Sequence, residues 1–182
     1  MKLCPKLMLD QMEFDGSKGT PNPTIKTAEP TGQSEYRYWL TRKWDNERPL
    51  AGFIGINPST ADEQDSDPTL SKCQSIAYKF GFGGVILVNL FAVRDQEPSI
   101  VNTRSDPVGP NNKEYLQRFA EEIDCAIAAW GNAEAEYPER VQQVKETINR
   151  DLWAVYLTEK GYPKHLSRYS KEKVNPVRYN SV

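Results

Sequence analysis

The sequence predicts a three-layer α/β domain with a central four-stranded parallel sheet. Continuous apolar runs, which are typical of strands buried on both faces, alternate along the chain with amphipathic segments of helical period. The chain has 182 residues, which is the size of one domain with a substantial core. Strands of this kind joined by helices form a parallel sheet that helices cover on both faces.

The first 33 residues differ from the rest of the chain. They are rich in proline, glycine, threonine and lysine, and their apolar residues show no sustained period. Residues 1–33 are therefore expected to form a flexible leader, or one wrapped on the domain, and residues 34–182 the α/β domain. At its start, residues 36–44 alternate large rings with Arg37, Leu40 and Arg42, which predicts an amphipathic edge strand.

Four buried strands follow. They are expected at residues 50–56, 83–92, 125–131 and 151–158.

A helix is expected between each pair of successive strands. The first should begin after Asp67, an N-cap that stands before Pro68, and should end at Gly81. The other two are expected over residues 111–123 and 138–150, where apolar residues recur on one helical face. The predicted order is strand, helix, strand, helix, strand, helix, strand. In sheets built this way, ligands bind beyond the carboxyl ends of the strands.

Composition excludes several classes of protein. The longest apolar run is far shorter than the about 18 residues that span a bilayer, and the N-terminus has no export signal, so a cytoplasmic protein without membrane contact is expected. Cys4, Cys73 and Cys125 lie far apart without a C-x-x-C pair, which argues against a zinc, iron–sulfur or redox dithiol site. We expect no metal and no cofactor.

Charge bears on the possible partners. The net charge of −2 argues against coating nucleic acid by bulk electrostatics. Residues 159–182, however, carry six bases against two acids, so this segment could face phosphates.

Polar residues stand where the predicted strands end. Asn57 and Pro58 follow the first strand, and Asn57 by itself could be ordinary turn chemistry. Asn89 interrupts the second apolar run, and a buried amide costs about 1–3 kcal/mol without partners, so it should have a specific partner or a ligand. His165, the single histidine, follows the fourth strand and could also be an incidental surface residue.

At these residues the chain resembles the uracil-DNA glycosylase superfamily. The sequence GINPS resembles the first motif of the mismatch-specific uracil-DNA glycosylases, and GGVILVNLFAVR resembles the strand whose asparagine recognises a pyrimidine edge. CAIAAWG resembles the third core strand, and GYPKHLSR stands at the position of the superfamily's histidine motif. Residues 36–169 also resemble a bacterial and phage domain family of unknown function.

The resemblance implies a uracil-DNA glycosylase-like fold and a monofunctional DNA glycosylase that flips a base out and leaves an abasic site. Asn57 would hold the attacking water, Asn89 would pair with the flipped base, and His165 would hydrogen-bond the departing base. A true base could come from Asp62, Asp65 or Asp67, although Asp67 could instead only cap the helix. The remaining predicted substrate-binding residues are Gly55, Ile56, Pro58, Ser59 and Arg94, and the predicted DNA-binding residues are Lys164 and Arg168.

The expected partner is DNA and the expected state is a monomer. The excised base could be uracil, or a hydroxymethylated or glucosylated cytosine of phage DNA, which would indicate a role in phage defence. Two alternatives remain open. One is a hydrolase or transferase acting on free nucleosides or nucleotides, and the other is a non-catalytic reader of modified DNA.

Overall fold

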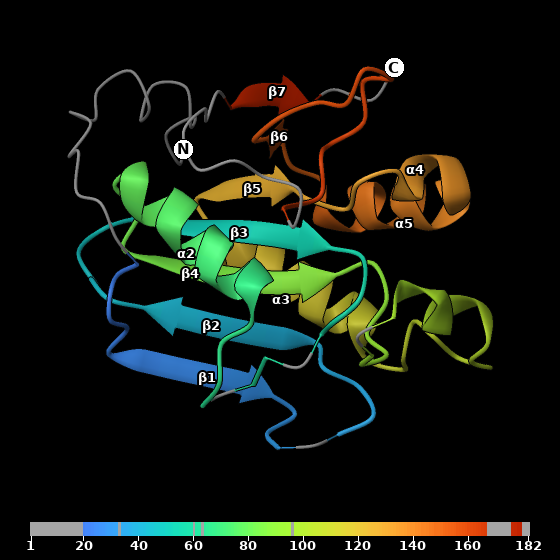
Figure 1. Cartoon of the computed structure of the whole chain (residues 1–182), viewed down its shortest axis with the longest axis horizontal. Helices are drawn as coiled ribbons and strands as arrows, with labels where there is room; N and C mark the ends of the chain where they lie inside the picture. Colours follow the sequence, from blue (N-terminus) through green and yellow to red (C-terminus); the bar gives the residue numbers. More distant parts are fainter. Residues whose placement is uncertain are drawn as a thin grey trace.

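A computed structural model describes residues 20–32, 34–59, 61–62, 64–95, 97–166 and 176–179 of the chain. Within this part, the strands form one sheet of seven in the order β1-β2-β4-β3-β5-β6-β7 (Figure 1). The strands are β1 Ile25–Glu29, β2 Trp39–Lys43, β3 Leu50–Gly55, β4 Gly84–Asn89, β5 Cys125–Ala128, β6 Leu152–Ala154 and β7 Val177–Tyr179.

The sheet is mixed, which corrects the prediction of a four-stranded parallel sheet. The middle strands β4, β3, β5 and β6 pair in parallel. The outer strands β1, β2 and β7 pair antiparallel to their neighbours. Strands β1 and β7 were not predicted, because they are short, partly exposed and polar, and so lack the apolar run that marks a buried strand.

Strand β2 is not the edge strand that its alternating sequence predicted. Strand β1, which lies inside the segment predicted as a leader, pairs with it along its whole length from Ile25 opposite Lys43 to Glu29 opposite Trp39. Four of the five residues of β2 are therefore buried. Part of the predicted leader thus belongs to the sheet.

The three predicted helices are confirmed, with shifts of a few residues at their ends. They are α2 Pro68–Lys79, α3 Asn112–Glu122 and α5 Pro138–Ile148, and a short α4 at Ala133–Glu136 and a 3-10 helix at Pro98–Asn102 accompany them.

The helices lie on both faces of the sheet, so the domain has three layers. Figure 1 shows α2 in front of the sheet. Leu70 and Cys73 of α2 pack with Phe53 of β3 in one apolar core. On the other face, Phe119 of α3 and Val144 of α5 pack in a second core.

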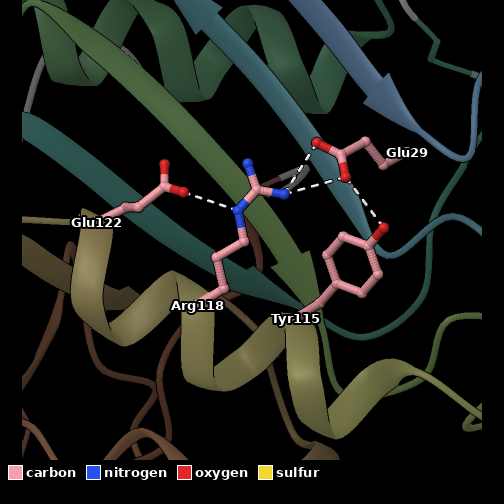
Figure 2. A network of polar contacts seen from close by, with 4 residues as sticks. All are labelled: Glu29, Tyr115, Arg118 and Glu122. Carbon is pink, nitrogen blue, oxygen red and sulfur yellow. Dashed lines mark hydrogen bonds and ion pairs between the residues drawn. The ribbon is translucent and has the colours of Figure 1, made fainter.

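A polar network ties the edge strand β1 to helix α3 (Figure 2). Both carboxylate oxygens of Glu29 accept from Arg118 Nη1 at 3.0 Å, and one also accepts from the Tyr115 hydroxyl at 3.0 Å. Arg118 Nε donates to Glu122 at 2.7 Å. The Arg118 guanidinium lies 4.3 Å from the centre of the Trp39 ring. Burial and the hydrogen bond to Glu29 raise the pKa of Tyr115.

Among the residues that the structure describes, no helix is both long and apolar enough to cross a bilayer.

The network predicts that Glu29 stabilises the fold more than Glu122 does. Glu29→Ala removes three hydrogen bonds between two elements and should lower the free energy of unfolding by about 1 kcal/mol, a modest value because these side chains are partly exposed. Glu122→Ala removes one pair within a helix and should cost about 0.3 kcal/mol. Urea denaturation of both variants measures the difference, and equal losses would mean that the network does not hold β1.

Candidate functional site

A pocket of about 290 Å³ lies at the carboxyl ends of β3 and β4, on the face of the sheet that α2 covers. Its volume is at the lower end of the range of small-molecule sites. Residues from six parts of the fold meet there: the segment before β2, the end of β3 with the loop after it, the start of α2, the end of β4 with the loop after it, the residue after β5, and the loop after β6. The predicted site residues that line it are Gly55, Ile56, Asn57, Ser59, Asp67, Asn89 and His165.

The parallel register of β3 and β4 places Asn89 in this pocket. Asn89, the last residue of β4, is the register partner of Gly55, the last residue of β3. A Cβ atom on Gly55 would lie 2.6 Å from Asn89 Oδ1, so only glycine leaves room for the amide there. The Asn89 residue is 8% exposed. Among the described residues, none forms a hydrogen bond with its side-chain amide, which leaves both the donor and the acceptor for a ligand.

Two helices on the opposite face hold the backbone at Asn89. Asn112, the first residue of α3 and 2% exposed, donates from Nδ2 to the Asn89 carbonyl at 3.3 Å. Arg140 of α5 donates to Asn112 Oδ1 at 2.6 Å and to the carbonyl of Leu90 at 2.7 Å. Burial lowers the pKa of Arg140, but these acceptors satisfy its charge. The Asn112 and Arg140 side chains therefore fix the end of β4 through its carbonyls and leave the Asn89 amide itself unengaged.

Asn57 is oriented by its own amide nitrogen. Nδ2 donates to the carbonyl of Asp95 at 3.0 Å and, more weakly, to that of Pro58 at 3.4 Å. Only the NH₂ group of an amide can donate to a carbonyl, so this geometry assigns the nitrogen and the oxygen of the side chain. Oδ1 is the group that remains for the pocket, and it can accept a hydrogen bond from a water or a ligand.

Asp95 is a pocket residue that the sequence did not reveal. Backbone bonds from Leu90 to the Gly55 carbonyl and from Asp95 to the Pro58 carbonyl, both 3.0 Å, run the chain after β4 alongside the loop after β3. This brings Asp95 next to Asn57, and this half-buried residue lines the pocket. One oxygen, Oδ1, accepts from Glu97 N at 2.9 Å.

Asp67 has two structural duties in the pocket wall. Its Oδ1 accepts from Leu70 N at 2.6 Å and caps α2, as the alternative interpretation of this residue predicted. Its Oδ2 accepts from the Ser59 hydroxyl. Asp62, another predicted base, closes a turn by accepting from the backbone of Gln64 and Asp65, which lowers its pKa. Asp67 is thus engaged by helix α2 and Ser59, and Asp62 by the turn that it closes.

Three arginines bind the backbone of the loop after β3. Arg37 Nη1 donates to the carbonyls of Ala61 and Ser59, and Arg42 Nη2 donates to those of Asp62 and Asp65. Arg37 and Arg42 are 3% and 0% exposed. Burial, followed by the nearby charge of Arg94, lowers the pKa of Arg37 to about 10, so this guanidinium still carries its charge at neutral pH.

Arg94, which was predicted to bind substrate, is the third of these arginines and is not among the described residues that line the pocket. It donates to the carbonyls of Gly32 at 2.7 Å and Ala61 at 3.5 Å. Arg37 lines the pocket in its place. Arg37 was missed because it lies before β2, a strand that local sequence does not link to β3 or β4.

His165 reaches the pocket from the loop after β6. It lies against Gly131, the residue whose φ of +61° turns the chain after β5, and a Cβ on Gly131 would stand 3.3 Å from His165 Cβ. Lys164 is exposed and does not line the pocket, and its backbone nitrogen donates to the Tyr156 carbonyl at 2.8 Å. Arg168 lies outside the described residues. Pro58 is buried beside the pocket without lining it.

The described residues contain no group of three or more histidine, cysteine or acidic side chains arranged to hold a metal. Cys73 lines the pocket, and burial raises its pKa well above the usual value, so the thiol stays protonated and is a poor nucleophile. The chemistry available from the described lining is therefore that of amides, carboxylates, hydroxyls, one imidazole and one guanidinium.

Comparison with protein-family models matches residues 37–165 to a family described as "Protein of unknown function (DUF1643)". The match begins at Arg37 and ends at His165, so the matched segment includes nearly the whole lining of the pocket. No curated protein and no solved structure matches the chain.

The contact between Gly55 and Asn89 predicts a specific coupling between the two positions. Gly55→Ala should lower the free energy of unfolding by about 1–2 kcal/mol, because the new methyl group forces the Asn89 amide out of its place. In an Asn89→Ala background the same change should be neutral or slightly stabilising, since alanine suits a strand better than glycine. Urea denaturation of the four proteins gives the coupling energy, and an equal loss in both backgrounds would contradict the proposed clash.

Proposed function

The chain belongs to the DUF1643 family, and we propose from the chemistry of its pocket that it is a DNA glycosylase, hydrolysing the N-glycosidic bond of an abnormal or modified base to leave an abasic site. The observation that carries the proposal is the Asn89 amide, which is 8% exposed, lines the pocket and has no hydrogen-bond partner among the described residues. An unpartnered buried amide costs about 1–3 kcal/mol, and a bound ligand with a matching polar edge offsets that cost.

A nucleobase is the ligand that this amide suits. A side-chain amide presents a donor and an acceptor side by side, as does the Watson–Crick edge of a pyrimidine. Enzymes that act on a base in DNA bind it flipped out of the duplex in a closely fitting pocket and read that edge by hydrogen bonds. The apolar side chains of Phe53 and Leu87 also line the pocket and provide surface for the faces of a ring.

Hydrolysis of the bond requires an attacking water and a means to absorb charge on the departing base. Asn57 Oδ1 is suited to hold the water, because its amide nitrogen is already bound to the Asp95 carbonyl. Asp95 is the better candidate for the base that takes the proton, since both oxygens of Asp67 are engaged by Ser59 and Leu70. His165, on another wall of the pocket, can donate a hydrogen bond to the base as negative charge develops there.

A hydrolase or transferase of free nucleosides or nucleotides is the second candidate. It would use the same amide, water and carboxylate but needs no surface for DNA. The observation that favours it is the position of Lys164, the one predicted DNA contact within the described part of the chain, which does not line the pocket. A reader of modified DNA would bind through the same amide without cleaving.

The test of the proposal is base release from a panel of substrates. Single- and double-stranded oligonucleotides carrying uracil, hydroxymethylcytosine or glucosylated cytosine, and the matching free nucleosides, are incubated with the protein. Abasic sites are then detected by alkaline cleavage, and free bases by chromatography. Release from an oligonucleotide supports the glycosylase, release from nucleosides alone supports the second candidate, and binding without release supports the reader.

Protein variants, assayed on the substrate from which the wild-type protein releases a base, should separate the roles of three pocket residues. Asn57→Ala and Asp95→Asn are each expected to lower kcat by about 100-fold or more with little change in binding, because both groups act on the attacking water. Asp67→Asn keeps an acceptor for the helix cap and serves as the matched control, with a loss below tenfold expected. A larger loss of kcat in Asp67→Asn than in Asp95→Asn would indicate that Asp67, and not Asp95, acts as the base.

Asn89 is expected to set the choice of base. Asn89→Asp presents acceptors only and should shift the ratio of excision rates toward bases that donate from the paired edge, as the cytosine amino group does. Asn89→Leu should reduce activity on every base, because it removes the pairing but leaves Asn57 and Asp95 in place. The ratio of rates on uracil-type and cytosine-type substrates is measured in all three proteins. An unchanged ratio would make Asn89 a structural amide.

A further inference from the structure

The pocket has a second buried group with unused hydrogen-bonding capacity, the guanidinium of Arg37. This residue is 3% exposed and lines the pocket. A guanidinium has five N–H donors in a fixed planar fork. Nη1 donates to the carbonyls of Ala61 and Ser59, the second at 3.4 Å. Among the described residues, none accepts a hydrogen bond from Nε or Nη2, so this edge of the fork is left for a ligand.

The surroundings of Arg37 favour a negative ligand. Arg37 and Arg94 both donate to the Ala61 carbonyl and Arg42 donates to that of Asp62, so three guanidiniums lie close together at this loop. Burial is the largest cause that lowers the pKa of Arg37, and the charges of Arg94 and Arg42 lower it further. The carboxylate of Asp67 opposes them, but its oxygens accept from Leu70 N and the Ser59 hydroxyl. An anion entering the pocket would therefore meet donors at Arg37 that no protein carboxylate already occupies.

The start of helix α2 contributes to the same wall. Thr69, in the first turn of this twelve-residue helix, lines the pocket beside Arg37. The N-terminus of a helix carries partial positive charge, which suits phosphate oxygens. In α2 Pro68 has no N–H and the N–H groups of Leu70 and Ser71 donate to Asp67, so the Thr69 N–H is the one in the first turn without a partner among the described residues. Thr69 at this helix end and Arg37 thus line the same cavity as Asn57 and Asn89, which stand at the strand ends.

We propose that Arg37 and the first turn of α2 form a phosphate subsite, so that the pocket takes a base together with a phosphate group attached to its sugar. The identity of the base rests on the function proposed above, but the phosphate subsite does not. An Arg fork and a phosphate form paired, charge-assisted hydrogen bonds, which are the stronger kind. The phosphate can come from a free nucleotide or from the backbone of a DNA strand, since both present the same anionic oxygens.

The test compares the binding of nucleosides with that of probes that carry the same base and at least one phosphate. Isothermal titration calorimetry measures the affinity of the wild-type protein for deoxyuridine and deoxycytidine, for their 5′-monophosphates, and for the trinucleotides that carry the same bases at the centre. We expect the monophosphates or the trinucleotides to bind at least about tenfold more tightly than the nucleosides. Preference for the monophosphate indicates a free nucleotide, and preference for the trinucleotide indicates a DNA strand. Equal affinity for nucleosides and all phosphorylated probes overturns the proposal.

Variants assign the preference to Arg37. Arg37→Gln should reduce the preference for phosphorylated probes, measured as the ratio of their affinity to that of the nucleoside for the same variant, to less than about twofold. Arg94→Gln is the matched control, because Arg94 also donates to the Ala61 carbonyl yet does not line the pocket, and this variant should retain the preference. A preference that persists in Arg37→Gln, or is lost equally in Arg94→Gln, overturns the assignment.

A second substitution covers the case in which Arg37→Gln does not fold. Arg37→Lys keeps the positive charge but loses the planar fork, so the preference should fall below that of the wild-type protein. An unchanged preference in Arg37→Lys would overturn the role of the fork. The base-release assay is independent of these titrations. A protein that binds phosphorylated probes through Arg37 but releases no base would refute the glycosylase proposal and leave the phosphate subsite standing.

Discussion

The binding of backbone carbonyls by buried arginines is the interaction on which the pocket depends. The loop after β3 carries Asn57, Ser59 and Asp67 to the pocket, and its irregular backbone needs donors from elsewhere in the protein for its carbonyl groups. Arg37 and Arg42 donate to four of those carbonyls, which accounts for the loop's irregular path beneath α2. These hydrogen bonds join arginine side chains to backbone carbonyls. The polar side chains of the loop are not needed for them and can line the pocket.

The parallel pairing of β3 with β4 brings the rest of the site to this loop. The parallel register places Gly55 opposite Asn89. Backbone hydrogen bonds between the two segments continue past the strand ends as far as the bond from Asp95 N to the Pro58 carbonyl. Gly55 therefore leaves the space that the Asn89 amide on the neighbouring strand occupies. Asn112, on the opposite face of the sheet, donates to the Asn89 carbonyl and fixes the end of β4.

The candidate site could be predicted in part, and its residues show where the limit lies. Asn57, Asn89 and His165 were found because each is a polar residue at the end of an apolar run, which is a local signal. Arg37 and Asp95 were missed because nothing in their neighbourhood marks them. Arg37 is placed by the pairing of β2 with β4, and Asp95 by hydrogen bonds to a loop nearly forty residues earlier in the chain.

The sequence by itself determined the four buried strands, the three helices between them and the gathering of polar residues at the carboxyl ends of the strands. It could do so because hydrophobic periodicity and capping residues act over a few neighbouring residues. Only the tertiary structure decided the order of the strands, the addition of β1 and β7 to the sheet, the place of β2 inside it, and the choice of which charged side chains enter the pocket. Those outcomes depend on contacts between residues far apart in the chain, and the energies of such contacts cannot be predicted from one segment of the sequence alone.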